Sequence, residues 1–319
     1  MRAIAILALL AATAAWAQMP KVYRIGVLET TSEAANRANL AAFRKGLREA
    51  GYVEGQNYVI DYRSAEGRAD RFPQLAAELV KAKPDVIVTR GFAAARAANG
   101  AGPVPVVMAS SADAVAAGVV KNLAHPGGNV TGLTTPIAEV AGRRIEVLKE
   151  LAPQTRRIGV LLNLSSAPTL AERRQIESTA KASGMEVRVF DVRDANALQR
   201  ALDEAAGQRV DALVVNSEGV LIANRDTILD FARRHRLPVM YAAREYVEAG
   251  GLIAYGVSYP NLYYRAASYV DRILKGARPG DLPIEKPTKT SLVINVSAAT
   301  ALGIPIPSKL LLRADELIR

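Results

Sequence analysis

One stretch decides the fold of this chain: Val104-Pro-Val-Val-Met-Ala-Ser-Ser-Ala-Asp113-Ala-Val-Ala-Ala-Gly118. A short run of β-branched residues after a proline predicts a buried strand over residues 104–109. Small polar residues follow at the carboxyl end of this strand, and residues 114–123 are expected to form a helix. Because ligands of open α/β sheets bind at the carboxyl ends of the strands, the stretch is expected to provide half of a binding site.

The chain before this stretch alternates strands with helices. Strands are expected over residues 22–28, 58–62 and 84–89, and amphipathic helices over residues 33–50 and 70–81. The helices are recognised by apolar residues at helical spacing and by their start and stop residues. This alternation predicts a parallel sheet that is covered by helices on both faces.

The same order of elements returns in the second half of the chain. Three strand motifs reappear in order: Arg24-Ile-Gly-Val-Leu28 as Arg157-Ile-Gly-Val-Leu161, Lys83-Pro-Asp-Val-Ile-Val88 as Arg209-Val-Asp-Ala-Leu-Val214, and Pro105-Val-Val-Met-Ala109 as Pro238-Val-Met-Tyr-Ala242. Two glycine-flanked extended segments, at residues 129–134 and 252–256, lie between the units and can absorb dihedral changes. The sequence therefore predicts an α/β fold of two Rossmann-like lobes with parallel sheets, joined by a multi-strand hinge.

The first residues have the form of a secretory signal. A charged start at Arg2 precedes an apolar run over residues 3–15, and Ala15-Trp-Ala17 fits a cleavage site. The run is too short to span a bilayer comfortably, although a retained anchor or a buried helix is the alternative. We expect cleavage near Gln18 and export to the periplasm.

These boundaries give a predicted domain organisation. Residues 1–17 form the signal peptide. The amino-terminal lobe is expected to contain residues 22–130 and 256–282, and the carboxyl-terminal lobe residues 131–255 and 283–319.

Composition argues against several classes of function. The chain has no cysteine, which excludes disulfides and thiolate chemistry, and its two histidines are too few for most metal sites. It has no G-x-S-x-G, P-loop, H-E-x-x-H or G-x-G-x-x-G motif. The net charge of +10 is spread over helices and mixed with acids. We therefore expect no catalytic residue, no metal, no cofactor and no nucleic-acid partner.

Polar residues gather at the predicted carboxyl ends of the strands, where hydroxyls, amides and helix N-termini bind small polar groups. The candidate ligand-binding residues are Thr30, Thr31, Ser32, Thr89, Arg90, Gly91, Ser110, Ser111 and Asp113 in the first lobe, and Asn163, Asn216, Glu218, Tyr241 and Tyr255 in the second. The alternative for the hydroxyl residues is that they only cap helices.

Four of these side chains suggest the chemistry of the ligand. Arg90 could hold a carboxylate bidentately, or could simply point to solvent. Asp113 could take an ammonium group, which favours an amino acid or a related zwitterion, or could only cap a helix. Tyr241 and Tyr255 could stack on the ligand, or belong to the core.

Motifs along nearly the whole expected mature chain resemble those of a known family. They are Gly51-Tyr-Val-Glu-Gly-Gln-Asn57, Lys83-Pro-Asp-Val-Ile-Val88, Pro105-Val-Val-Met108, Asp113 with Ala116-Ala-Gly-Val119, Pro126-Gly-Gly-Asn-Val-Thr-Gly132 and Gly250-Gly-Leu-Ile-Ala-Tyr-Gly256. The sequence resembles the ABC transporter substrate-binding proteins, a periplasmic family that includes tryptophan and tyrosine binders.

The resemblance implies a type I binding-protein fold whose lobes close on a small molecule. The sequence differs from the usual family pattern at Asp113-Ala114, where Asp-Pro is usual, and at Leu162-Asn163-Leu164, where Trp-Asn-Pro is frequent. We expect a monomeric, non-enzymatic receptor that delivers an amino acid or related carboxylate to an inner-membrane ABC permease. A sensory receptor of the same fold and a two-lobed enzyme are the alternatives.

Overall fold

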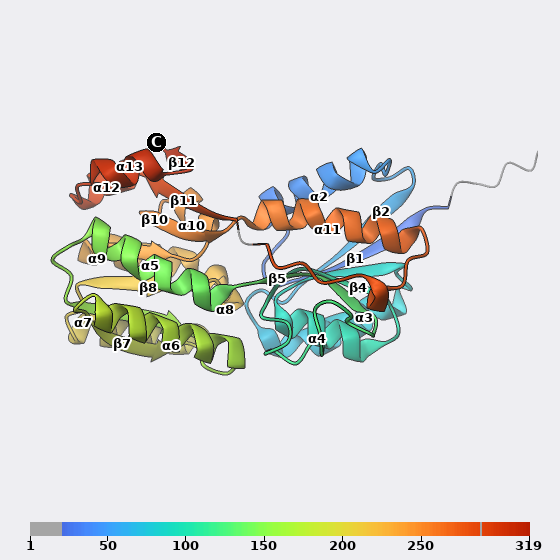
Figure 1. The fold of residues 1–319 in the computed structure, drawn as a ribbon, viewed down its shortest axis with the longest axis horizontal. Helices are drawn as coiled ribbons and strands as arrows, with labels where there is room; N and C mark the ends of the chain where they lie inside the picture. The colour runs from blue at the N-terminus through green and yellow to red at the C-terminus, as the bar shows by residue number, and fades with distance from the viewer. Residues whose placement is uncertain (1–20, 288) are drawn as a thin grey trace, which may run out of the picture.

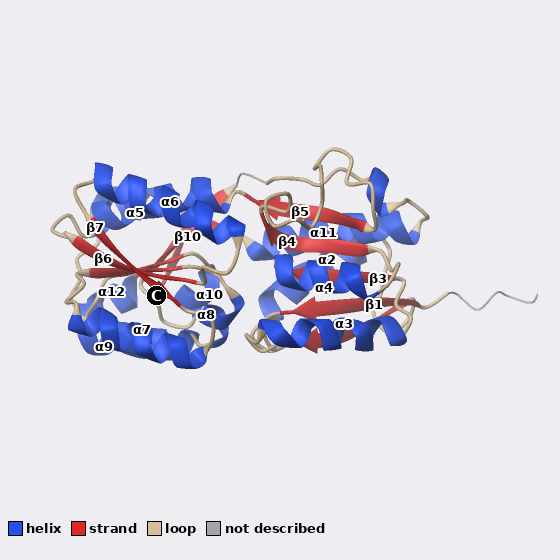
Figure 2. Cartoon of the chain, turned by 90° about the horizontal axis from the view of Figure 1, so that it is seen from below, coloured by secondary structure: helices blue, strands red, loops and turns tan. Residues whose placement is uncertain are grey.

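Two α/β lobes lie side by side along the long axis of the molecule (Figure 1), and each consists of a sheet between layers of helices (Figure 2). This computed structural model describes residues 21–287 and 289–319. The expected signal peptide, residues 1–17, lies outside the described residues. Within the described ranges, no helix has the length and apolar character needed to cross a membrane.

The first sheet contains five strands in the order β2-β1-β3-β4-β5, and all neighbours are parallel. Its strands are β1 (Tyr23–Glu29), β2 (Tyr58–Ser64), β3 (Val86–Arg90), β4 (Val106–Ala112) and β5 (Val130–Thr135). Helices α2 (Arg37–Glu49) and α11 (Tyr259–Leu274) cover one face, and α3 (Phe72–Lys81) and α4 (Phe92–Ala101) cover the other (Figures 1 and 2).

The apolar residues of these strands fill two cores, because successive side chains of a strand point to opposite faces. In β3, Val86 and Val88 pack in the core that contains the α2 and α11 side chains. Ile87, between them, packs in the core beneath α3 and α4. This explains why the strand reads as an unbroken apolar run, as predicted for a sheet covered on both sides.

The second sheet contains seven strands in the order β12-β11-β10-β9-β8-β6-β7. They are β6 (Arg157–Leu162), β7 (Glu186–Asp191), β8 (Ala212–Val215), β9 (Val239–Tyr241), β10 (Ile253–Val257), β11 (Thr290–Asn295) and β12 (Glu316–Ile318). Its pairs are parallel except for β10 with β11. The two parallel-dominant sheets confirm the predicted fold class.

Helices surround the second sheet as they do the first. Helices α5 (Ile137–Leu151) and α6 (Ala167–Ala182) lie on one face, and α7 (Ala195–Gly207) and α9 (Arg225–His235) on the other (Figure 2). The shorter helices are α8 (Gly219–Ala223), α10 (Arg244–Glu248), α12 (Val296–Leu302) and α13 (Ser308–Arg313).

The chain passes between the lobes three times, after β5, after β10 and before β11. The last crossing runs along β5, because Thr134 N donates to Glu285 O at 2.8 Å and Glu285 N donates to Gly132 O at 3.0 Å. Strand β5 hydrogen-bonds to β4 in the first sheet. A lobe boundary after residue 130 would separate most of β5 from that sheet, so sheet pairing favours a boundary after Thr135.

The structure corrects one prediction about the opening stretch. Residues 114–123 form turns and contain no helix. Ala117 N donates to Asp113 O at 2.8 Å, but Gly118 then adopts a φ of 67°. This left-handed residue ends the helical path after one turn, as glycine commonly does. The strand itself runs further than predicted, to Ala112.

Candidate functional site

A cavity of about 190 Å³ lies between the lobes and takes its wall from both of them. Of the residues predicted from the sequence, those on the wall are Thr30, Arg90, Gly91, Ser110, Asn163, Asn216 and Glu218. They lie in the last residues of β3 and β4 or just beyond β1, β3, β6 and β8, so the carboxyl ends of both sheets face one another here.

In the first lobe, the turn from β3 into α4 forms one side of the cavity. Gly91 precedes α4 with a φ of 86°, a conformation that favours glycine, and its N–H donates to Ser110 O at 2.7 Å. Gly91, Phe92 and Ala93 line the cavity together with Ser110. The amino-terminal end of α4 therefore faces the cavity, where its free amides and dipole favour an anion.

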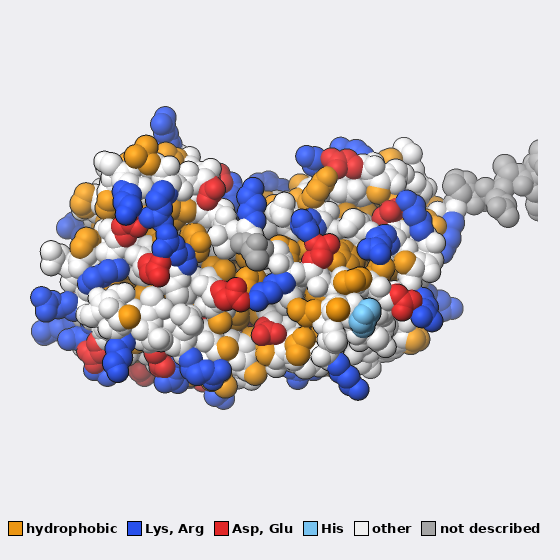
Figure 3. Space-filling model, viewed as in Figure 1, with side chains coloured by type: hydrophobic (Ala, Val, Ile, Leu, Met, Phe, Trp, Pro, Cys, Tyr) orange, Lys and Arg blue, Asp and Glu red, His pale blue; other side chains and the backbone are white. Residues whose placement is uncertain are grey.

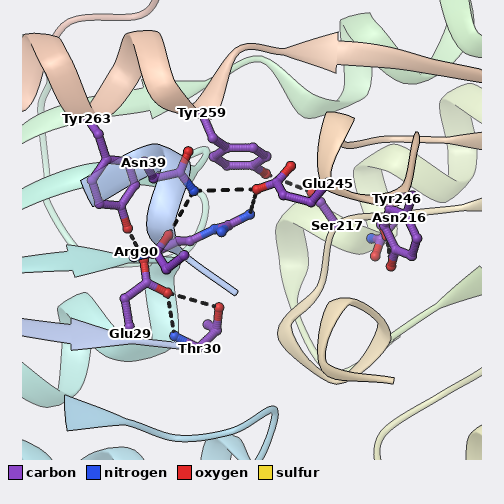
Figure 4. A network of polar contacts seen from close by, with 11 residues as sticks. Glu29, Thr30, Asn39, Arg90, Asn216, Ser217, Glu245, Tyr246, Tyr259 and Tyr263 are labelled. Carbon is purple, nitrogen blue, oxygen red and sulfur yellow. Dashed lines mark hydrogen bonds and ion pairs between the residues drawn. The ribbon is translucent and has the colours of Figure 1, made fainter. Parts of the chain in front are cut away.

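Arg90 connects this turn to the second lobe. Its side chain is buried, and Nη2 donates to Glu245 Oε1 of α10 at 3.0 Å (Figure 4). Its guanidinium carbon lies 4.0 Å from the ring centroid of Tyr259. Burial alone would lower the pKa of Arg90, but the Glu245 and Glu29 carboxylates raise it above its ordinary value. Arg90 is thus a charged, buried residue and not a solvent-exposed one.

Other polar contacts lie beside Arg90, and one of them joins the lobes. Tyr259 Oη at the start of α11 donates to Ser217 Oγ at 2.8 Å (Figure 4). Glu29 at the end of β1 is fully buried, accepts from Thr30 N at 2.8 Å and receives the Tyr263 hydroxyl. Burial raises the pKa of Glu29, and the nearby Arg90 opposes this rise.

In the second lobe, asparagine side chains shape the two loops of the wall. Asn163 Oδ1 accepts from Ser165 N at 3.1 Å and from Ser165 Oγ at 2.7 Å. Asn216 Oδ1 accepts from Glu218 N at 2.8 Å, and its Nδ2 donates to Glu172 Oε2 at 3.1 Å. Both asparagines fix the path of the chain directly after a strand.

Two glutamates on this side differ in their partners. Glu172 is buried and accepts from Arg144 Nη1 at 2.7 Å. Glu218 accepts from Thr169 Oγ1 at 3.1 Å. Burial raises the pKa of Glu218 to about 7; the Thr169 hydrogen bond opposes the rise and Glu172 adds to it.

The remaining predicted residues lie away from the cavity wall. Asp113 is exposed, and its Oδ1 accepts from Ala116 N at 3.1 Å, so it caps a turn. Tyr241 is buried against Tyr246, with ring centroids 4.6 Å apart. Tyr255 Oη accepts from Thr290 Oγ1 at 2.8 Å. A role for these residues in ligand binding stays a prediction.

The same holds for the other hydroxyl residues. The Thr31 carbonyl oxygen accepts a hydrogen bond from the Tyr62 hydroxyl at 2.7 Å, and Ser32 Oγ accepts from Ala35 N at 3.3 Å. Thr89 and Ser111 are buried within β3 and β4. Successive side chains of a strand point to opposite faces of the sheet, so Thr89 and Ser111 point to the faces opposite those of their neighbours Arg90 and Ser110, which line the cavity.

Several cavity residues escaped sequence reasoning. The rings of Phe72, Phe92 and Tyr259 line the wall, as do Arg144 and Glu172. A signal for Arg144 did exist. It lies between Val140 and Leu148 at four-residue spacing on the buried face of α5, where a charged side chain requires a partner.

Basic and acidic side chains are mixed on one face of the molecule. On the face shown in Figure 3, Lys and Arg side chains are scattered over both lobes and lie among acidic ones. The net charge of +10 therefore forms no continuous basic patch on this face.

Two sheet-and-helix lobes with a polar cavity at their facing strand ends define a two-lobed solute-binding protein. The model of the family described as ABC transporter substrate binding protein matches residues 24–318. The chain belongs to this family, whose members are extracytoplasmic receptors for small molecules and not enzymes. More distant transporter solute-binding proteins share the type I fold.

Three relatives are informative. A tyrosine-binding protein of Clostridioides difficile (strain R20291) is 26% identical over 89% of this chain and 82% of its own length. The structure of an ABC domain in complex with L-Trp from Streptococcus pneumonia has 28% identity and a TM-score of 0.84, covering 93% and 100% of the two chains. A ligand-free, open substrate-binding protein from Clostridium difficile has 26% identity and a TM-score of 0.64, covering 93% and 99%.

Proposed function

We propose that this protein is the periplasmic solute-binding component of an ABC transporter. It captures an aromatic amino acid by lobe closure and delivers it, as a monomer, to a permease in the inner membrane. The observation that carries the proposal is the cavity between the lobes, in which aromatic rings and charged groups occur together. The names of two relatives, a tyrosine binder and an L-Trp complex, support the choice of ligand class.

The aromatic side chain of the ligand would lie against Phe72, Phe92 and Tyr259. Aromatic pairs add about 0.5–1.5 kcal/mol each to the burial of apolar area. The carboxylate would lie at the amino-terminal end of α4, with the Ser110 hydroxyl beside it. Arg90 adds positive charge to this end of the cavity, although Glu245 already occupies one of its amino groups.

Lobe closure is supported by close contact between the lobes. A Cβ atom added to Gly219 of the second lobe would lie 3.1 Å from Thr30 Cβ of the first. The TM-score is also higher with the L-Trp complex, 0.84, than with the ligand-free open structure, 0.64. Both observations fit a closed arrangement of the chain.

Calorimetry with L-tryptophan, L-tyrosine and the other standard amino acids tests the proposal. We expect one of the aromatic amino acids to bind with a Kd at or below about 10 μM, equivalent to about 7 kcal/mol. Small-angle scattering should show a smaller radius of gyration at saturation than without ligand. Absence of binding by every amino acid at 1 mM would contradict the proposal.

Export is tested separately. We expect the amino terminus of material purified from the periplasm to lie near Gln18, because Ala15-Trp-Ala17 fits the signal peptidase pattern. Amino-terminal sequencing or intact-mass spectrometry measures this directly. An intact Met1 on soluble periplasmic protein would contradict cleavage.

A further inference from the structure

Within the binding cavity, the structure assigns Glu218 as the residue that holds the ammonium group of the ligand. Binding of this group releases a proton from Glu218. This inference rests on the proposed function and specifies one end of the same site. It follows from the pairing of charges in the cavity wall and from the positions of the two carboxylate oxygens.

The charged side chains of the wall are almost all neutralised by protein partners. Arg90 pairs with Glu245 at 3.0 Å and Arg144 with Glu172 at 2.7 Å. Arg193 pairs with Asp191 at 2.7 Å. The remaining charged residue of the wall is Glu218, which forms no ion pair with any residue in the described ranges. The cavity therefore lacks one cation.

Glu218 is also held in a fixed position. Its N–H donates to Asn216 Oδ1 at 2.8 Å, and its Oε1 accepts from Thr169 Oγ1 at 3.1 Å. Asn216 is fixed in turn by Glu172 at 3.1 Å. The Oε2 atom makes no hydrogen bond to the described part of the chain, so one oxygen of a positioned carboxylate is available to a ligand.

Other nearby carboxylates are occupied. Both oxygens of Glu172 accept hydrogen bonds, one from Arg144 and one from Asn216. Glu29 accepts from Thr30 and Tyr263, and Glu245 holds Arg90 through its Oε1 atom. The Glu245 Oε2 atom has no hydrogen bond in the described part of the chain, but it is buried and Glu245 does not line the cavity. These carboxylates have donors before any ligand arrives, whereas an ammonium group at Glu218 would gain a full charge-assisted hydrogen bond.

The groups that face Glu218 explain why it carries a proton before the ligand binds. Thr169 and Glu172 approach from α6 and Asn216 from the end of β8, while Arg90, Arg144 and Arg193 line the same cavity but are paired. Burial holds the pKa of Glu218 at about 7, so the residue is about half protonated at neutral pH. An ammonium ion favours the ionised form, so its arrival drives the proton into water.

Calorimetry with paired ligands tests the inference. The probes are L-tryptophan and L-tyrosine, and their deaminated analogues 3-indolepropionate and 3-(4-hydroxyphenyl)propionate. We expect the wild-type protein to bind the analogues about 10- to 100-fold more weakly than the amino acids, since they lack the charge-assisted hydrogen bond. Glu218→Gln should lose most of this discrimination. Glu204→Gln, which removes an exposed glutamate of α7, is the matched control and should retain it.

The pH dependence provides a second measurement. Affinity of the wild type for the amino acid should rise about tenfold from pH 6 to pH 8, because Glu218 changes from mainly protonated to mainly ionised. Titration in buffers of different ionisation enthalpy should detect a released proton at pH 6 and almost none at pH 8. Glu218→Gln should show neither effect.

The outcomes separate the inference from the proposed function. If the deaminated acids bind the wild type as tightly as the amino acids, or if no proton is released at pH 6, the inference is overturned and the receptor function stands. If no amino acid or analogue binds, both are overturned. Circular dichroism checks the fold of Glu218→Gln; should this variant not fold, the two wild-type measurements decide alone.

Discussion

Two buried arginine–glutamate pairs of this protein have similar chemistry and different consequences. Arg144 and Glu172 join α5 and α6 within the second lobe at 2.7 Å, with side chains 5% and 2% exposed. Arg90 and Glu245 join the two lobes at 3.0 Å, with side chains 5% and 10% exposed. In the proposed function the lobes separate to admit the ligand; the first pair would then stay buried, whereas the second would be divided and each charge would regain water.

The comparison shows that burial alone does not decide what an ion pair contributes. A pair that is buried in every folded conformation affects the free energy of unfolding, because removal of one partner leaves an uncompensated charge. A pair that is buried only in the closed form affects the equilibrium between open and closed forms, and through it the ligand affinity.

The largest effect is expected from Arg144→Ala. This change leaves Glu172 buried without its cation, and should lower the free energy of unfolding by about 3–5 kcal/mol at pH 8. Urea denaturation of the ligand-free protein measures it. A loss below about 1 kcal/mol would show that Glu172 gains water in the variant, and that the pair is not a fixed part of the lobe.

A smaller effect with a different readout is expected from Glu245→Gln. Ligand affinity should fall by about 10- to 100-fold, because one charge-assisted hydrogen bond of the closed form becomes a neutral one. The free energy of unfolding should change by less than about 1 kcal/mol, since Arg90 is solvated when the lobes open. Equal losses of affinity and stability would contradict the assignment of this pair to closure.

Glu218 predicts a pH effect on stability with a definite sign. The pKa of Glu218 is about 7 in the folded protein, above the value of 4.5 for the free residue. Its contribution to the free energy of unfolding is therefore fully present below pH 4.5 and is lost as the pH rises through 7. The change in the free energy of unfolding caused by Glu218→Gln in the ligand-free protein should therefore be more stabilising at pH 8 than at pH 5. We expect about 1–2 kcal/mol, reduced by exposure to the cavity. Denaturation at the two pH values measures it, and a reversed order would contradict it.

The smallest effect is expected where the lobes meet. Gly219→Ala places a methyl group 3.1 Å from Thr30 Cβ in the closed form only, so affinity should fall about threefold while the unfolding free energy is unchanged within about 0.5 kcal/mol. Gly207→Ala in α7 is the control, because nothing lies within 4 Å of the added atom. Equal affinities of the two variants would argue against lobe contact at Gly219.

Local sequence patterns were sufficient to predict the architecture. Repetition of strand motifs such as Arg24–Leu28 and Arg157–Leu161 implied two similar sheets, because apolar runs between amphipathic helices can only be buried on both faces. Chain order also placed Arg90, Ser110, Asn163 and Asn216 at strand ends, where they line the cavity. Strand periodicity and local turn chemistry depend on a few neighbouring residues, so they can be recognised in the sequence without the tertiary structure.

The pairing of charges depends on the tertiary structure. Arg90 and Glu245 are 155 residues apart, and no local pattern links them. The cavity wall also includes side chains from the faces of α5 and α6, and strand-end reasoning does not reach these helices. The roles of Asp113 and Glu218 differ for the same reason. Both acids follow a strand, but Asp113 is exposed at a turn and Glu218 is partly buried in the cavity wall, because desolvation depends on the distant segments that cover each residue.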